Sequence, residues 1–312
     1  MTSQPQWPQL KLDDWASTRE TLHMWLQILG KIELESTVLV NHWWNAALQV
    51  SARGLRTGLM NGGDRRFDAE FDFIDHQLVF RSTDGASSSV ALTSRSVADF
   101  YNATTQALSE LEFHVKISAT PNEVDPAIPF AQDETHRQFD PSAAETFWRQ
   151  LVAADQVFQT WRARFGGKSS PVQVFWGSMD LSCVRYSGRS APQWVGEPPP
   201  ACPKWVLQEA ESRECASAGF WPGGSEEGSF YAYASPSPKG YTDASLSVGR
   251  FDTTIGEWIL DYADVRQSED PAATLMSFLE ETYGLAADLA HWDRSLLDID
   301  PGRFDQERRH SQ

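Results

Sequence analysis

Three side chains that can exchange protons, those of His42, Asp180 and Glu214, lie in or beside aromatic-rich stretches of the 312-residue sequence. Histidine titrates near neutral pH, and a carboxyl group can act as an acid, as a base or as a metal ligand. We therefore take these three residues as the candidate catalytic groups. Each also has a structural interpretation: a hydrogen-bonded core histidine, an aspartate held by the backbone or by Arg185, and a solvated glutamate at a strand edge.

Tryptophans lie close to all three candidate groups. We expect a small-molecule pocket whose substrate-binding residues are Trp43, Trp44, Trp176, Ser178, Trp221 and His23. The turn Gly219–Gly224 is expected to point Trp221 into this pocket, with residues 224–228 as its flexible rim. His23, on the first predicted helix, either lines a polar seam or faces water.

The sequence favours an enzyme that acts on a small, partly aromatic or apolar molecule. Two alternatives stay open: a non-catalytic small-molecule-binding protein and a homo-oligomeric interaction module with exposed tryptophans. An enzyme needs proton-transfer or metal-binding groups within reach of one another, whereas a binding protein needs only an apolar cavity. An interaction module would carry its aromatic side chains as a surface patch.

Established motifs for phosphate, zinc and nucleophile chemistry are missing from the sequence, which contains no GxGxxG, GxxxxGK[ST], HExxH or GxSxG string. The three cysteines, Cys183, Cys202 and Cys215, have neither disulfide-framework nor zinc-site spacing. We assign no metal ligand. The cofactor is unknown, because dispersed His, Asp and Glu ligands leave no motif.

The composition limits the partners. The formal net charge is −17, which argues against nucleic acid and anionic membrane, because both attract clustered Lys and Arg. No signal peptide is recognised, and no apolar run approaches the roughly 20 residues of a membrane helix. We expect a cytoplasmic protein that binds a small molecule and that could form a homo-oligomer.

The elements that must position these residues follow from periodicity. Apolar spacings of three and four predict helices from Ser17 to Gly30, from Ser96 to Leu111, from Pro141 to Phe165 and after Pro271. Strands are expected at 42–53, 67–73, 78–80, 89–93, 112–118, 172–186, 213–220, 229–235 and 256–262. In the strand 42–53, His42 falls on the apolar phase with Trp44, and in 172–186 Asp180 shares a phase with Trp176 and Ser178.

The order of these elements repeats weakly along the chain. It predicts an α+β fold of two pseudo-repeats, about residues 7–111 and 112–292, with helices packed on one face of antiparallel sheets. We expect residues 1–293 to form a single compact unit, followed by a polar, flexible tail at 294–312.

Seven blocks, most of them with aromatic residues, occur along the chain: Thr21–Trp25, Val40–Trp44, Phe71–His76, Arg95–Tyr101, Gly167–Val172, Phe175–Ser178 and Gly219–Gly224. Together these blocks resemble a bacterial family known as domain of unknown function 5996. The resemblance spans about residues 7–293 and implies one whole-chain unit, but no activity. The family is expected to have a histidine beside Glu214, where this chain has Arg213, so no histidine role is assigned there.

Overall fold

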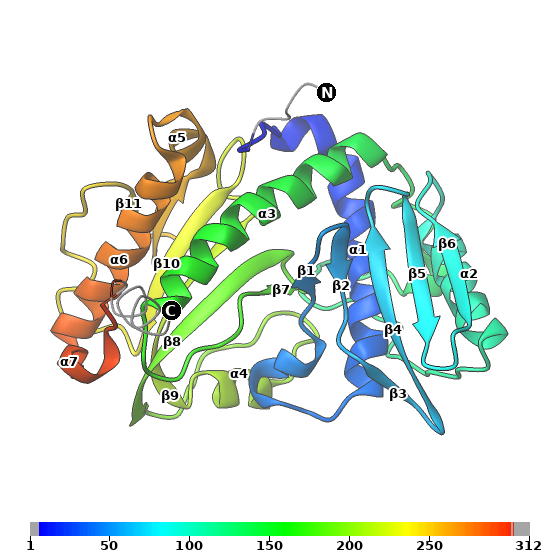
Figure 1. Cartoon of the computed structure of the whole chain (residues 1–312), viewed down its shortest axis with the longest axis horizontal. Coiled ribbons are helices and arrows are strands. Elements are labelled where there is room, and N and C mark those ends of the chain that lie inside the picture. The colour runs from blue at the N-terminus through cyan, green and yellow to red at the C-terminus, as the bar shows by residue number, and fades with distance from the viewer. Residues whose placement is uncertain (1–5, 301, 303–312) are drawn as a thin grey trace, which may run out of the picture. The chain divides into compact units, whose positions relative to one another are not determined.

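The computed structural model describes residues 6–300 and 302 (Figure 1). This part of the chain contains α-helices and two antiparallel six-stranded sheets, which confirms the α+β class. Two compact units are assembled from interleaved stretches. The first takes residues up to Val152, Gln173–Asp180 and Val195–Ala210, and the second takes Ala153–Val172, Leu181–Trp194 and Glu211 onward. Neither set of boundaries follows the expected repeats, and the pseudo-repeat stays a prediction.

The sheet of the first unit is a meander with the order β1-β2-β4-β5-β6, and β3 also pairs with β4. Its strands are β1 (Gln49–Val50), β2 (Gly54–Arg56), β3 (Met60–Gly62), β4 (Arg65–Asp72), β5 (Gln77–Ser82) and β6 (Ser87–Ala91). Phe67, Ala69 and Phe71 of β4 are fully buried, whereas Asp68 and Glu70 between them are partly exposed. The alternation seen in the sequence therefore correctly predicts a strand with one buried face.

The helices of the first unit are α1 (Leu12–Ser36), α2 (Val97–Glu110) and α4 (Lys204–Ala210), with the 3-10 turns η1 (Asn41–Ala46) and η2 (Phe130–Gln132). The helix α3 (Pro141–Ala163) begins in this unit and ends in the second. The helix α2 begins next to Ser96, where its start was predicted, and the Ser96 hydroxyl caps it by accepting a hydrogen bond from the Asp99 amide at 3.1 Å.

The first helix is longer than its sequence signals suggest. It includes a break in helical geometry at Trp15, and it continues through Gly30 to Ser36. Gly30 therefore does not end the helix. A Cβ atom at Gly30 would lie 2.1 Å from Cδ1 of Trp176, so the glycine makes room for the indole ring of a residue far along the chain.

The second sheet has the strand order β11-β12-β10-β9-β8-β7. Its strands are β7 (Gln173–Phe175), β8 (Asp180–Ser190), β9 (Arg213–Trp221), β10 (Ser229–Ser235), β11 (Arg250–Asp252) and β12 (Glu257–Asp261). The residues of β7 belong to the first unit, and those of the other strands from Leu181 onward belong to the second. The helices α5 (Tyr262–Gln267), α6 (Pro271–Leu289) and α7 (Arg294–Leu297) follow. The helix α6 begins at Pro271, where a helix was predicted, and Asp270 caps it. It contacts β9 and β10.

Arg185 of β8 is an unusual core residue of the second unit. It is 1% exposed, and its guanidinium carbon lies 3.8 Å from the ring centre of Trp161 and 4.3 Å from that of Tyr283. Its Nη1 lies 3.7 Å from a carboxylate oxygen of Glu280. The charge is therefore balanced by one carboxylate and two aromatic faces.

Three further expectations about local structure are wrong. Of residues 42–53 only Gln49–Val50 form a strand (β1), because Asn41–Ala46 turn as η1, and residues 112–118 contain no strand. The predicted strand 172–186 is interrupted by a turn between β7 and β8. The predicted tail begins with α7, and the Ile299 amide bonds to the Arg164 carbonyl at 2.9 Å, whereas the flexibility of the tail stays a prediction. The end of that tail, at 301 and 303–312, lies outside the described residues.

The close approach of Gly30 to Trp176 gives a stability prediction. Gly30→Ala should lower the free energy of unfolding by about 1–3 kcal/mol, since the added methyl group overlaps the indole ring. Gly284→Ala in α6 is the matched control. Its new Cβ would meet only Arg294 at 3.5 Å, so helix propensity should raise stability by about 0.5–1 kcal/mol. Urea unfolding of both variants checks this, and a Gly30→Ala variant as stable as the wild type contradicts it.

Candidate functional site

The turn Trp176–Asp180 of the first unit gathers several of the predicted site residues. Trp176 is 4% exposed, and its indole nitrogen donates a hydrogen bond to the Ala46 carbonyl at 2.9 Å. The Ser178 hydroxyl donates to Oδ1 of Asp180 at 2.5 Å. Asp180, 8% exposed, begins β8. The burial of Asp180 agrees with its phase in the sequence, although the turn replaces the continuous strand expected there.

The helix α1 presents three polar side chains, spaced by four residues, to this region. Such spacing places His23, Gln27 and Lys31 on one face of the helix. The Nε2 atom of His23 lies 2.7 Å from the Gly177 carbonyl oxygen, which can only accept. The same Nε2 atom lies 3.1 Å from the side-chain nitrogen of Gln27, so His23 links the turn to the next polar side chain of the helix face.

Gln27 and Lys31 both form hydrogen bonds with Asn122. The Asn122 amide donates to Oε1 of Gln27 at 2.7 Å, and Nε2 of Gln27 donates to the Asn122 carbonyl at 2.8 Å. The ammonium group of Lys31 donates to Oδ1 of Asn122 and lies 5.6 Å from the Trp176 ring centre. Burial lowers the pKa of Lys31 to about 8, and no carboxylate of the described residues lies within ion-pair distance of it.

Glu123, which follows Asn122, is the last of the polar residues that surround the turn Trp176–Asp180. Its amide donates to the Pro200 carbonyl at 2.8 Å, and Nδ2 of Asn122 donates to the Ala201 carbonyl at 2.9 Å. The residue is exposed as a whole, but its carboxylate lies against Gly177. A Cβ atom at Gly177 would be 2.0 Å from Oε1 of Glu123.

The carboxyl group of Glu123 has an unusual proton affinity. Burial of the carboxyl group, and then the negative charge of Asp180, raise the pKa of Glu123 to about 7. At neutral pH this group is therefore present in both protonation states. That is the condition under which a carboxyl group can both give and take a proton.

Backbone strain is concentrated in these segments. Eight non-glycine residues of the described part have positive φ, and five of them lie in the turn, in η1 or in the two loops that meet at Asn122. The five are His42, Trp43, Glu123, Met179 and Ala201. Left-handed backbone costs free energy for such residues, and strain of this kind concentrates at functional sites.

Aromatic rings of η1 pack against residues of β7 and of the turn that follows it. Trp43 stacks on Trp176 with ring centres 6.0 Å apart and meets Trp205 of α4 edge-on at 6.3 Å. His42 stacks on Phe175 at 4.9 Å, and burial lowers its pKa to about 4. Figure 1 shows η1 beside α4. His42, Trp43 and Trp44 are half-buried, and the positive φ of His42 overturns the strand-phase argument for its position.

Glu214 and Trp221 belong to the second unit. The Glu214 carboxylate accepts hydrogen bonds from Nε of Arg189 at 2.8 Å and from the Ser187 hydroxyl at 3.0 Å. Its place in the fold is therefore explained by an ion pair with Arg189. Trp221 is 40% exposed and lies over Gly223 of its own turn, which contradicts the expected inward orientation.

The loop 224–228 beyond Trp221 was expected to be a flexible rim. It contains Glu227, which is 4% exposed. Arg266 donates hydrogen bonds to both carboxylate oxygens of Glu227, at 2.8 and 3.0 Å. This bidentate pair anchors the loop within the second unit.

Four residues of this site, Gln27, Lys31, Asn122 and Glu123, were not predicted from the sequence. A signal existed for the first two, because polar residues four and eight positions after His23 lie on a helix that is otherwise buried. No signal marked Asn122 and Glu123, which lie in an irregular loop. Trp205 of α4 was not singled out either.

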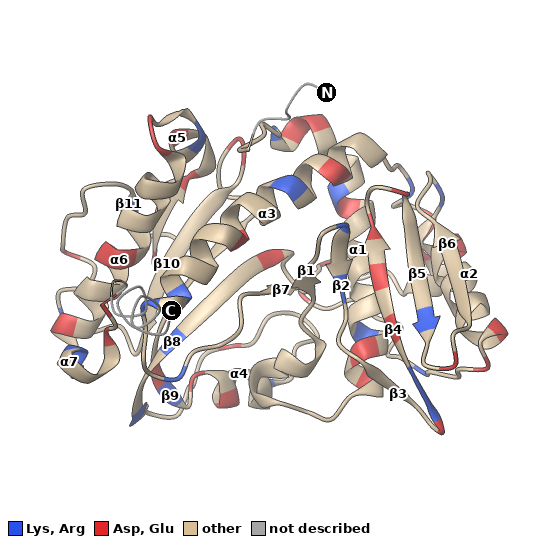
Figure 2. Ribbon diagram, viewed as in Figure 1, with Lys and Arg blue, Asp and Glu red and all other residues tan. Residues whose placement is uncertain are grey.

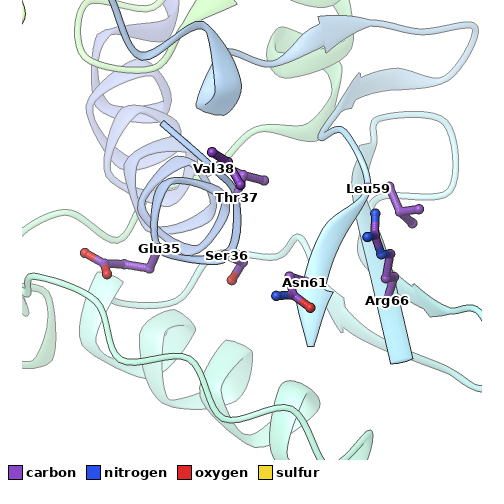
Figure 3. Close-up of a pocket in the computed structure, with 7 residues that line it drawn as sticks. All are labelled: Glu35, Ser36, Thr37, Val38, Leu59, Asn61 and Arg66. Atoms are coloured by element: carbon purple, nitrogen blue, oxygen red, sulfur yellow. The ribbon is translucent and has the colours of Figure 1, made fainter. Parts of the chain in front are cut away.

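A separate hollow of about 370 Å³ lies between the end of α1 and the β3–β4 hairpin (Figure 3). It is lined by Glu35, Ser36, Thr37, Val38, Leu59, Asn61 and Arg66. None of the residues expected to bind substrate lines it.

Side chains of the metal-ligating types and cysteine thiols also occur among the described residues. Among residues 6–300 and 302, no three His, Cys, Asp or Glu side chains are grouped so as to hold a metal ion. The three cysteines are free thiols, and burial raises the pKa of each of them, to about 11 for Cys183 and Cys202. In the described part no helix is both long and apolar enough to cross a membrane.

Comparison with known proteins gives one match. The model of a family described as a family of unknown function, DUF5996, matches residues 7–299. No curated protein and no solved structure matches the chain significantly.

The lowered pKa of the two buried imidazoles predicts acid sensitivity. Burial lowers the pKa of His23 and of His42 to about 4, against 6.5 for a free histidine. Between these values the unfolded chain binds protons that the folded chain does not, so stability falls as the pH falls from 6.5 to 4.

His42→Phe keeps a ring that can stack on Phe175. It removes the imidazole that takes up a proton in the unfolded chain at position 42. The variant should lose less melting temperature between pH 6.5 and 4.5 than the wild type does. His114→Phe, at an exposed position, is the control and should keep the wild-type slope. Equal slopes for all three proteins would contradict the burial argument for His42.

Proposed function

The chain belongs to this family of unknown function, and we propose that it is an enzyme that transfers protons to or from a small molecule at Glu123 and Asp180. The observation that carries the proposal is the Glu123 carboxyl group, whose pKa is raised to about 7 beside Asp180. Pairs of carboxyl groups whose environments separate their proton affinities are a recurrent arrangement in acid–base catalysis.

The surrounding residues take supporting roles. Burial of the Glu123 carboxyl group, and then the negative charge of Asp180, keep Glu123 protonated to higher pH. Ser178 orients Asp180 through its 2.5 Å hydrogen bond. His23 fixes the turn through the Gly177 carbonyl. In this proposal His42 is a neutral ring that supports the aromatic group, and Glu214 takes no part in proton transfer.

The aromatic side chains indicate the type of substrate. Trp205 is 45% exposed and Trp43 is half-buried, and they meet edge-on. Their faces suit an aromatic or apolar part of a small molecule, with its reacting polar group directed to Glu123. The net charge of −17 supports a substrate other than nucleic acid or anionic lipid. We place this activity in the cytoplasm, which the free thiols support.

The test is consumption of a small molecule from a deproteinised metabolite mixture, followed by mass spectrometry. The wild type should deplete at least one compound, and Glu123→Gln should slow this by about 10²–10⁴-fold, the usual contribution of a general acid or base. Glu112→Gln is the matched control, because Glu112 is also an exposed glutamate with positive φ. It should react at the wild-type rate.

Two results would count against the proposal. Depletion that proceeds equally in the Glu123→Gln variant removes Glu123 from the chemistry. A compound that is bound by the wild type but never consumed supports the alternative, a non-catalytic small-molecule-binding protein.

Gly177→Ala tests the position of the carboxylate without removing it. The new methyl group would overlap Oε1 of Glu123, which sits at the end of a flexible side chain and can move away. Turnover should fall on the order of 100-fold, as expected for a misplaced reacting group, while the melting temperature changes little. Full turnover in this variant would show that the contact of Glu123 with Gly177 is unimportant.

A further inference from the structure

An exposed apolar segment connects α1 to η1. Val38, Leu39 and Val40 are 87%, 59% and 47% exposed, respectively. The backbone is extended at both ends of the segment, with φ −130° and ψ 161° at Thr37 and φ −123° and ψ 150° at Val40. Within the described residues the main chain of Val38 and Leu39 makes no hydrogen bond. An extended, unpaired segment of this kind is a template for pairing with another chain.

Other exposed apolar side chains continue this surface. Leu59, 52% exposed, lines the 370 Å³ hollow together with Val38, and Asn41 joins the segment to α4 through a 3.4 Å hydrogen bond to the Glu209 carbonyl. We call Val38, Leu39, Val40 and Leu59 the apolar ridge. Four of the eleven exposed large apolar residues of the described part belong to it, so the ridge is a concentrated feature of the surface rather than scattered exposure.

The charge of the protein restricts what can cover the ridge. Residues 36–52 contain no Asp, Glu, Lys or Arg, and Figure 2 shows the ribbon from the end of α1 to β1 without charged residues. Two copies that each carry −17 repel one another over most of their surface. They approach at the least cost through an uncharged face, and aromatic and aliphatic residues without charge are typical of the core of an interface.

Opposite charges lie at the edges of the hollow. Glu35 and Arg66 both line it and both are exposed, and neither forms an ion pair with a described residue. In Figure 3 their side chains lie apart, with Ser36, Thr37 and Asn61 between them. A two-fold axis that passes near the segment would bring Arg66 of one copy toward the partner's Glu35, twice per dimer.

We propose that two copies of this chain form a symmetric dimer through the apolar ridge, with the Thr37–Val40 segments paired as antiparallel strands. A two-fold axis makes every contact occur twice, so a segment that is self-complementary in shape and charge is suited to it. The pairing satisfies the free main-chain groups of Val38 and Leu39, and the hollow accepts aliphatic side chains of the partner. This proposal does not depend on the acid–base function.

Sedimentation equilibrium of the purified full chain tests the proposal over about 1–100 µM, a range that detects micromolar association. The wild type should show twice the monomer mass at the upper end. Leu39→Glu should weaken dimerisation at least about tenfold, because it buries unpaired like charges across the axis. Ile255→Glu, at a 52% exposed aliphatic residue of the second unit, is the matched control and should dimerise as the wild type does.

A charge exchange identifies the partner as a second copy. Glu35→Arg and Arg66→Glu should each weaken dimerisation about tenfold, and the double variant should recover it, because only a second copy supplies both exchanged residues. Circular dichroism confirms that each variant is folded. A wild type that stays monomeric over the whole range overturns the proposal, and so does a double variant that remains as weak as the single ones.

Discussion

The arrangement of the candidate site depends on the hydrogen bonds between the Gln27 side chain and the main chain of Asn122. One amide group satisfies both the N–H and the C=O of Asn122, at 2.7 and 2.8 Å, in a buried environment where an unpaired main-chain group is costly. This fixes the loop on α1, and the next residue, Glu123, is thereby directed to Gly177. Lys31 strengthens the same attachment by donating to the Asn122 side chain.

The rest of the site follows from two close approaches that only glycine permits. Gly30 lets the Trp176 indole lie on α1, and Gly177 lets the Glu123 carboxylate lie on the turn. The strain of the left-handed residues in these segments is compensated by the bonds that surround them, such as the Glu123 amide to the Pro200 carbonyl at 2.8 Å. A carboxyl group held in this way beside Asp180 keeps its proton to higher pH, and this couples the packing of α1 to the proposed chemistry.

Much of the fold could be predicted from the sequence, because periodicity and caps are local signals. The alternation in β4 and the starts of α2 near Ser96 and of α6 at Pro271 were predicted correctly. The turn η1 could not be predicted in this way, because its aromatic residues favour a strand by propensity. The turn forms instead because the Asn45 side chain hydrogen-bonds to the Val40 amide and to the Thr37 hydroxyl. Asp180 was found from its phase, but its partner Glu123 lies 57 positions before it (180 − 123) in an irregular loop that carries no periodic signal.

The central claim is that Asp180 and the surrounding protein hold the Glu123 carboxyl group near its titration midpoint at neutral pH. A carbon-13 NMR titration of the glutamate side-chain carboxyl groups, assigned with Glu123→Gln, measures this directly. The account predicts a midpoint near pH 7 for Glu123 in the wild type and a lower midpoint in Asp180→Asn, where the negative charge is removed. A midpoint near the ordinary value of 4.5 in the wild type, or one that Asp180→Asn leaves unchanged, would contradict it.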